Sequence, residues 1–563
     1  MSGFSGILIF NDAYQVNLKS YNFPDYVNRF YKKKSEIKED GFVACHYAND
    51  KFSNDKFLKA SNSYVVGFDG VRFGAMQCEP DSSKDEMLNT IINVKGSFTA
   101  LHFNKNSKEL FLFADQTSSR QFFYFGNEDF AAFSSSIFLL SDILRHFAIK
   151  LSLSEQATYM MLSFGYMLED FTLVKEIKKI KAGEYVYISK CKSKNHRYHD
   201  YYRDVAYTKI NIDLLSELDF RFKKSLDLEY SKDVYYNYEH IATLSGGLDS
   251  RLNVMLAHEY DYKDITALTF SEGFKSDELI ARKISSDLSL KHIVLLLNNG
   301  FQLYDLETPL MLNNCAVYYF GAAQTLAAVR RLNLSSYGLF HNGGLAESSK
   351  GGYLGALHHE TPSLRRRYVV SDTLFNRIDE AMLESILQSY PNDEMFVTYN
   401  RGFNAIHNGA WMTLPFTDTT YTYMDLEFAH LAYSIDPALR FEGKLTIDWM
   451  QNKHPRLIKY PWKYGIKPTN SRSKLLIGKV VNKLKRELLG ANDVPVPFDD
   501  WYKNDIKLQA FVDDQYNNSL SWQFIPKSIG KDIQFLFNQG TIVEKFLCIS
   551  FLKSVEMIFV RNA

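Results

Sequence analysis

The chain has 563 residues, of which 46% are hydrophobic and 23% charged, an ordinary balance for a large globular protein with two or three sizeable cores. Its 65 basic and 65 acidic residues cancel, which argues against binding of nucleic acid or membranes through overall charge. No signal-peptide pattern and no run of about 18 apolar residues occurs, so we expect a cytoplasmic protein without a membrane span.

The five cysteines are odd in number, far apart and without CxxC or other metal-ligand spacing. This usage predicts free thiols in a reducing compartment. The five are Cys45, Cys78, Cys191, Cys315 and Cys548.

Short β segments separated by turn-rich pieces dominate the chain to about residue 200, which predicts stacked antiparallel sheets with helices outside. The segments are Gly6 to Phe10, Tyr64 to Phe68, Ser97 to Phe103, Glu109 to Ala114, Phe122 to Gly126 and Glu184 to Ile188. The polar, lysine-rich stretch Ser189 to His199 is the best linker candidate. We therefore predict one domain over residues 1–200 and a second over 201–563.

Beyond about residue 205, helices and strands alternate, as is typical of a parallel α/β sheet with right-handed crossovers. The predicted elements are a helix around Asp213 to Lys224, a strand before Ser245 and a helix after it, a strand Ile265 to Phe270, a helix Asp277 to Leu288 and a strand His292 to Leu297. Ligands of such sheets bind outside the carboxyl ends of the strands.

The hexapeptide SGGLDS, Ser245 to Ser250, lies at such an end, between an apolar strand and a helix. Adjacent glycines let the backbone approach an anion, and a helix N-terminus offers free N–H groups. Asp249 would repel an anion unless a cation lay between them, which indicates a ligand for the Mg²⁺ of a nucleotide. The alternative is an ordinary Gly-Gly turn with Asp and Ser capping a helix.

SGGLDS has no lysine after its glycines and is not a Walker-type loop. It resembles the pyrophosphate-binding PP-loop, and its flanks resemble the synthetase domain of the asparagine synthetase superfamily. Thr269 to Gly273 is similar to the segment of that family that contacts adenine. The resemblance implies ATP and Mg²⁺ as cofactors, with ATP bound by Leu244, Ser245, Gly246, Gly247, Asp249, Ser250, Phe270, Ser271 and Asn342.

The N-terminal segment Met1 to Ile7 resembles the opening of class II glutamine amidotransferases, whose N-terminal nucleophile hydrolase domain exposes a cysteine after Met1 is removed. Ser2 stands in place of that cysteine and is a weaker nucleophile near neutral pH. His46 to Asp50 replaces the family's Arg-Gly-Pro-Asp, and Asp69 replaces the oxyanion-hole asparagine. The resemblance implies an αββα sandwich that has naturally lost its glutaminase activity.

Two further segments resemble catalytic parts of the synthetase family. Tyr460 to Ile466 is similar to its late Arg-Pro-Lys-x-Gly-Phe segment, which implies that Lys463 is catalytic and stabilises charge on the α-phosphate. His341 to Glu347 is similar to its Ser-Gly-Glu-Gly-x-Asp-Glu segment, but Ala346 stands where the metal-binding Asp would be. Either Glu347, predicted as a second catalytic residue, or another acid such as Asp277 takes over metal binding, or this half-site is impaired.

The stretch Ser473 to Gly490 has apolar residues at helical spacing and a basic face. We expect a solvated amphipathic helix packed on the second domain, with a membrane-surface helix as the alternative.

These features predict an α/β and α+β protein: an N-terminal nucleophile hydrolase-like sandwich, then a PP-loop parallel α/β domain with a helical C-terminal part. The predicted activity is that of an ATP-dependent amide ligase, in which a small-molecule or peptide carboxylate becomes an acyl-adenylate and ammonia or a substrate amine displaces AMP. Ring closure within one substrate molecule is one form of this activity, and a homodimer is one option for the assembly. The alternatives are a glutamine-hydrolysing asparagine synthase-type enzyme and a nucleotide-binding pseudoenzyme.

Overall fold

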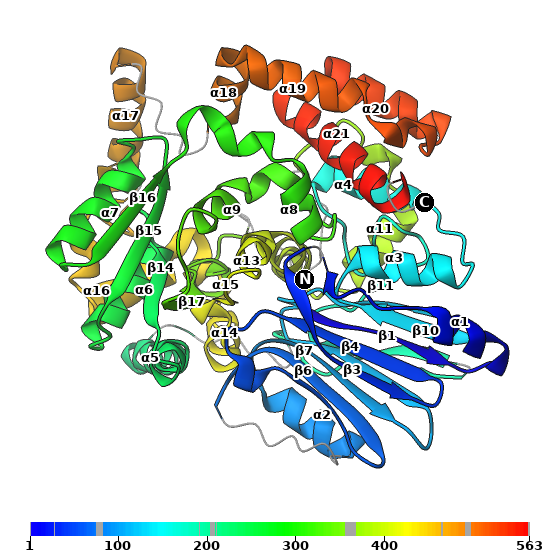
Figure 1. Cartoon of the computed structure of the whole chain (residues 1–563). Coiled ribbons are helices and arrows are strands. Elements are labelled where there is room, and N and C mark those ends of the chain that lie inside the picture. Colours follow the sequence, from blue (N-terminus) through cyan, green and yellow to red (C-terminus); the bar gives the residue numbers. More distant parts are fainter. Residues whose placement is uncertain are drawn as a thin grey trace.

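The computed structural model describes residues 2–27, 29–74, 83–190, 192–202, 209, 211–354, 368–462, 465–489 and 497–560. The predicted catalytic Lys463 and two of the cysteines, Cys78 and Cys191, lie outside these ranges. The three cysteines within them are free and buried: Cys45, Cys315 and Cys548. Figure 1 shows a half rich in antiparallel strands, coloured blue to cyan, beside a half in which helices surround a parallel sheet.

The first antiparallel sheet has the strand order β11-β9-β10-β1-β4-β3-β2. Its central strand β1 lies between β10 and β4, with Ile7 opposite Ala132 and Val43. The bounds are β1 Gly3–Ile9, β2 Tyr26–Val27, β3 Tyr31–Glu39, β4 Phe42–Ala48, β9 Phe123–Gly126, β10 Phe130–Ser134 and β11 Lys178–Lys179.

The second sheet has the order β13-β12-β8-β7-β6-β5. Its bounds are β5 Phe57–Ala60, β6 Tyr64–Phe73, β7 Lys95–Asn104, β8 Glu109–Ala114, β12 Glu184–Ser189 and β13 Lys192–Arg197. The prediction of a linker from Ser189 to His199 is wrong. This segment contains the edge strand β13, which pairs with β12 along its whole length. Its side chains are almost all exposed, so its polar composition reflects an edge strand with solvent around it.

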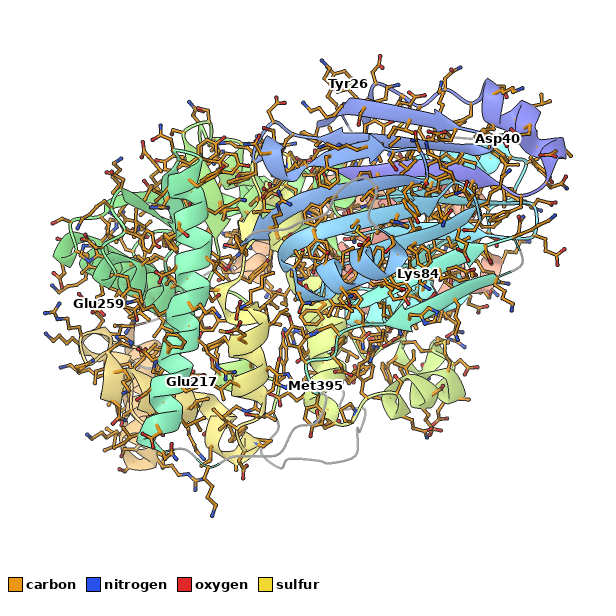
Figure 2. The ribbon with its side chains drawn as sticks, turned by 90° about the horizontal axis from the view of Figure 1, so that it is seen from below. Tyr26, Asp40, Lys84, Glu217, Glu259 and Met395 are labelled. Atoms are coloured by element: carbon orange, nitrogen blue, oxygen red, sulfur yellow. The ribbon has the colours of Figure 1, made fainter. Side chains whose placement is uncertain are left out.

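The two sheets pack face to face. Phe4 and Phe42 of the first sheet share a buried core with Leu101 and Leu112 of the second. Helix α3 (Ile137–His146) covers the outer face of the first sheet, and α2 (Lys84–Asn93), which carries the Lys84 labelled in Figure 2, covers that of the second. This helix, sheet, sheet, helix layering confirms the predicted stacked antiparallel sheets with helices outside.

The second half contains a five-stranded sheet of order β16-β15-β14-β17-β18, in which every neighbouring pair is parallel. The strands are β14 Glu239–Thr243, β15 Ile265–Ser271, β16 Lys291–Leu296, β17 Tyr337–His341 and β18 Thr419–Thr420. The flanking helices are α5 Ile212–Tyr235, α6 Leu248–Glu259 and α7 Ser276–Asp287. The predicted alternation of strands and helices is confirmed, although α5 is longer than expected.

Helices make up most of the remaining chain. They are α4 Glu155–Phe164, α8 Glu307–Leu312, α9 Ala323–Val329, α10 Glu347–Lys350, α11 Glu380–Gln388, α12 Asp393–Val397, α13 Asn408–Thr413, α14 Leu426–Tyr433, α15 Pro437–Arg440, α16 Lys444–Lys453, α17 Arg472–Leu489, α18 Phe498–Asn504, α19 Ile506–Asn517, α20 Lys527–Gln539 and α21 Ile542–Val555. Within the described ranges, no helix is both long and apolar enough to cross a membrane. One hydrophobic cluster joins α3 to α21 and the parallel sheet, so the two halves share a core.

A solvated amphipathic helix packed on the second domain was predicted for residues 473–490, and its apolar face is not packed. The helix is present as α17, but Leu476, Ile477 and Val480 are exposed. Most surface helices bury their apolar side chains against the core. In α17 these side chains lie in solvent instead.

Candidate functional site

The chain turns sharply between β14 and α6, through the SGGLDS segment. Ser245 Oγ accepts a hydrogen bond from the Gly247 N–H at 3.1 Å, and Ser250 Oγ accepts one from the Ser245 N–H at 3.0 Å. Gly247 is the N-cap of α6 and supplies no side chain to cap the helix. The start of α6 therefore offers its N–H groups and positive dipole end at the carboxyl edge of the parallel sheet, as an anion-binding site requires.

Two glycines allow the close packing around this turn. A Cβ on Gly246 would lie 2.5 Å from Asp277 Oδ1, and a Cβ on Gly343 would lie 2.5 Å from Ser250 Cα. Gly343 follows β17 and Asp277 begins α7, so the ends of three parallel strands converge here. The structure thus brings the predicted SGGLDS, Asp277 and 341–347 segments together at one edge of the sheet.

Arg251 fixes the loop to a distant segment. It is fully buried and donates to the carbonyl oxygens of Gly246 at 2.8 Å, Pro461 at 2.7 Å and Leu457 at 3.1 Å. Burial lowers the pKa of Arg251 to about 10, so the guanidinium remains charged near neutral pH. Sequence reasoning missed this residue, which holds the chain just before Lys463 against the loop.

Asp249, the predicted metal ligand, pairs with a lysine that the sequence did not single out. Its carboxylate lies 2.8 Å from Lys350 Nζ, which is also 4.0 Å from Glu347 Oε1. Burial lowers the pKa of Lys350, but the carboxylates of Asp249 and Glu347 outweigh it and raise that pKa overall. Burial and the neighbouring Asp249 raise the pKa of Glu347, whose Oε2 is buried without a hydrogen-bond partner.

The other predicted nucleotide-binding residues lie at the ends of neighbouring strands. Phe270 and Ser271 end β15, where the Ser271 hydroxyl accepts from the Gly273 N–H at 3.0 Å. Asn342 follows β17, and its side-chain oxygen accepts from the Gly344 N–H at 2.9 Å, so that oxygen supports its own turn. Ala346 is buried and offers no metal ligand.

Ser2, at the N-terminus of β1, is buried in a cluster of charged side chains. Its hydroxyl donates to Asp69 Oδ2 at 3.0 Å and accepts from Arg120 Nη1 at 2.5 Å. Arg120 also donates to Asp69 at 2.7 Å, and His46 Nε2 lies 2.8 Å from the other Asp69 oxygen. His46, Asp69 and Arg120 therefore form one hydrogen-bonded cluster around Ser2.

This cluster continues into the second half of the chain. Arg120 pairs with Asp418, and Lys56 Nζ lies 3.1 Å from the second Asp418 oxygen. Burial raises the pKa of Asp69, but Arg120 and the His46 hydrogen bond hold it well below its usual range. Burial lowers the pKa of Lys56 to about 7. A buried ion network of this kind holds the two halves in register.

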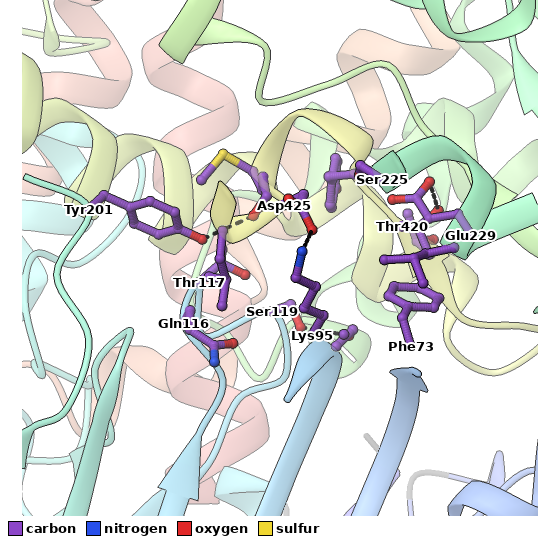
Figure 3. Close-up of a pocket in the computed structure, with 17 residues that line it drawn as sticks. Phe73, Lys95, Gln116, Thr117, Ser119, Tyr201, Ser225, Glu229, Thr420 and Asp425 are labelled. Atoms are coloured by element: carbon purple, nitrogen blue, oxygen red, sulfur yellow. Dashed lines mark hydrogen bonds and ion pairs between the residues drawn. The ribbon is translucent and has the colours of Figure 1, made fainter. Parts of the chain in front are cut away.

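A small cavity of about 60 Å³ lies between the halves, and Figure 3 shows the side chains around it. Lys95 spans it and contacts Asp425 at 2.9 Å, while Ser97 and Ser119 hydrogen-bond each other at 2.6 Å. Glu229 lies on another wall, where it accepts from Thr420 at 3.0 Å. These residues come from distant segments, and no sequence motif indicates the cavity.

Asp233, His240 and His341 form a buried group whose spacing would suit a metal ion. Asp233 Oδ2 lies 2.9 Å from His240 Nδ1 and 2.8 Å from His341 Nε2. Burial lowers the pKa of His341, but Asp233 and Glu229 outweigh it and raise that pKa to about 9. The ring nitrogens that a metal would need are already paired with the carboxylate, so this group is an ion network that ties α5 to β14 and β17.

Comparisons with known proteins give only distant similarity. No family model matches the chain, and no curated protein matches it. It is similar to the solved structure of glutamine phosphoribosylpyrophosphate amidotransferase from B. subtilis complexed with ADP and GMP, at 9% identity and a TM-score of 0.21, over 52% of this chain and 75% of that one. A structure described as the allosteric regulatory enzyme of purine biosynthesis has 10% identity and a TM-score of 0.21, over 52% of this chain and 74% of that one. A TM-score of 0.21 is too low to support a conclusion about fold family or function.

Proposed function

We propose that this chain is an ATP-dependent amide ligase that activates a carboxylate as an acyl-adenylate and does not hydrolyse glutamine. One observation carries the proposal: a glycine turn joins parallel strand β14 to the uncapped start of α6, with acidic side chains in the first turns of α7 and α10, the helices after the neighbouring strands. An uncapped helix N-terminus binds phosphate groups, and acids beside it suit the cation that accompanies a nucleotide. In this proposal the first 200 residues keep the sandwich as a structural domain, and residues 201–563 carry the activity.

The loop binds the pyrophosphate portion of ATP. The Gly246 and Gly247 backbone approaches the phosphates, and the hydroxyls of Ser245 and Ser250, 3.0 Å apart, supply further donors. Leu244, Phe270 and Ser271 lie at the ends of β14 and β15, on the side where the adenine is placed. Arg251 holds the loop rigid, so the N–H groups keep their orientation as charge develops on the leaving group.

The donor set fits Mg²⁺. Asp249 supplies one carboxylate at the loop, where it pairs with Lys350. Asp277 lies beside the loop at Gly246 and supplies a second oxygen donor. Carboxylate oxygens with phosphate oxygens are the usual ligands of Mg²⁺. When bound, the ion neutralises the phosphate charge.

The chemistry has two balanced steps. The substrate carboxylate attacks the α-phosphate, forming the acyl-phosphate bond and releasing pyrophosphate; an amine then forms the amide bond, losing a proton and releasing AMP. In this proposal Lys463, two positions after the Pro461 that Arg251 contacts, stabilises the negative charge of both steps, and Glu347, whose pKa is raised by burial, accepts the amine proton.

The nitrogen comes from ammonia or from an amine of the substrate. Ser2 is buried and bonded on both sides by Asp69 and Arg120, so glutamine has no free nucleophile there. An amine within the substrate would make the reaction an intramolecular ring closure.

A nucleotide-binding pseudoenzyme is the second candidate. Ala346 in place of a metal-binding acid and the direct ion pair of Asp249 with Lys350 favour it. Binding of ATP without turnover distinguishes this candidate from the ligase.

The experiment is pyrophosphate release from Mg²⁺-ATP by purified protein with a panel of acids, with ammonia, amines or glutamine as the nitrogen source. We expect release that needs an acid plus ammonia or amine, ignores glutamine, and disappears in Asp249→Ala and Lys463→Ala. Asp261→Ala changes an exposed acid just past the end of α6 and serves as the matched control. ATP binding without release across the panel would contradict the ligase, and release supported by glutamine would contradict the assignment of Ser2.

A further inference from the structure

Helix α17 presents an apolar face that the rest of the described chain leaves uncovered. Leu476, Ile477, Val480, Val481 and Leu484 are between 43% and 64% exposed. At 3.6 residues per turn these five share one side of the helix. Helix α17 lies at the edge of the molecule (Figure 1).

The opposite side of α17 is less exposed. Gly478 is buried and Leu475 is partly buried, and both lie on the side away from the five exposed side chains. The helix therefore turns its apolar face outward. This arrangement is the reverse of an ordinary surface helix, which buries its apolar side.

Positive charge is concentrated on the same helix. Its sequence contains six basic residues and one acidic residue, a net of five positive charges in a chain whose total net charge is zero. Lys474 borders the apolar face on one edge, and Lys479 and Lys483 border it on the other. Lysines at the edges of an apolar helical face extend their ammonium groups to the level of lipid headgroups.

We propose that α17 docks this protein on an anionic membrane surface. The helix lies in the plane of the interface, with its apolar face among the acyl-chain ends and its lysines on the anionic headgroups. It does not span the bilayer, because no described helix is apolar enough to do so. A second copy fits the face less well, since pairing two α17 helices would bring together two sets of five positive charges.

The test is flotation of the full-length protein with vesicles of phosphatidylcholine containing about one third phosphatidylglycerol, against pure phosphatidylcholine. We expect binding to the anionic vesicles that weakens as salt is added. The double variant Ile477→Ser/Val480→Ser lowers the partition coefficient at least about tenfold, because two apolar side chains leave the interface. Lys479→Gln/Lys483→Gln lowers it by about fivefold per charge removed.

The matched control is Ile506→Ser, which changes a side chain that is 78% exposed at the start of α19. We expect this variant to bind the anionic vesicles as strongly as the unmodified protein does. Equal binding to both vesicle types, or unchanged binding by the Ile477/Val480 variant, would overturn the proposal. Sedimentation velocity completes the test: a concentration-dependent dimer lost in that variant would assign the face to a second copy instead. Thermal unfolding verifies that each variant is folded.

Discussion

Lys350 Nζ lies 2.8 Å from Asp249, so the acid of the glycine turn faces an internal cation. Lys350 stands at the end of the short helix α10, three residues after Glu347. Its ammonium neutralises two carboxylates at the edge where the nucleotide phosphates are proposed to bind. In the proposed complex the same ammonium contacts a phosphate oxygen of the nucleotide.

Lys350→Met therefore lowers the affinity for Mg²⁺-ATP by about tenfold or more, because a charge-assisted hydrogen bond contributes ~1.5–3 kcal/mol. Isothermal titration calorimetry measures the change. Lys283→Met is the matched control, since Lys283 also pairs with an acid, Asp287, at 2.9 Å but on the exposed side of α7. Equal affinities in the two variants would limit Lys350 to a structural role.

Gly343→Ala places a methyl group 2.5 Å from the Ser250 Cα, where only backbone atoms can give way. We expect a loss of ~1–3 kcal/mol in the free energy of unfolding and reduced pyrophosphate release, because the turn must move. Urea unfolding and the release assay measure the two effects. Gly409→Ala is the control, as its Cβ meets nothing within 4 Å and α13 gains helix propensity. A variant as stable and active as that control would show that the turn adapts freely.

Ser2→Cys does not restore glutamine hydrolysis. The side chain remains buried between Asp69 and Arg120, and the Asp69 carboxylate would repel a developing oxyanion. Release of glutamate from glutamine measures the activity. The double variant Ser2→Cys/Asp69→Asn tests whether Asp69 as well as Ser2 prevents glutamine hydrolysis. Glutamate produced by Ser2→Cys alone would refute the proposed role of the cluster.

His341→Asn changes how stability depends on pH. The pKa of His341 is raised to about 9 in the folded protein, against about 6.5 when unfolded. The stabilisation is complete below about pH 6.5 and is lost as pH rises through about 9. The difference in unfolding free energy between wild type and variant therefore declines by about 1.4 kcal/mol per pH unit over this range.

Urea unfolding at several pH values measures this difference, and comparison with the wild type cancels the other titrating groups. Burial lowers the pKa of His454, but Asp219 and Glu259 outweigh it and raise that pKa to about 9, so His454 contributes to the pH dependence of stability with the same sign as His341. Lys56, whose pKa burial lowers, contributes with the opposite sign. His454→Asn gives a parallel slope change at a site remote from the sheet. A pH-independent difference for His341→Asn would mean that its ring is neutral in the folded protein.

Local patterns in the sequence were sufficient for the elements and for the turn. Short apolar runs bounded by turn-rich pieces set β8 and β12 to within one residue of their observed ends. The glycines and serines of SGGLDS bond within the turn itself, so a strand, turn and helix were predictable there. The polar composition of β13 was misleading, because an edge strand in solvent has the same composition as a linker.

What the sequence by itself determined was the layered antiparallel sandwich, the parallel sheet and the glycine turn between β14 and α6, since each arises from residues close together in the chain. Only the tertiary structure decided the partners of these residues. Lys350 and Asp249 are 101 positions apart, and Arg120 and Asp418 are 298 apart. Such contacts depend on strand order and on how the halves pack. The outward apolar face of α17 has the same origin, because helical spacing defines a face but only packing decides whether that face is covered.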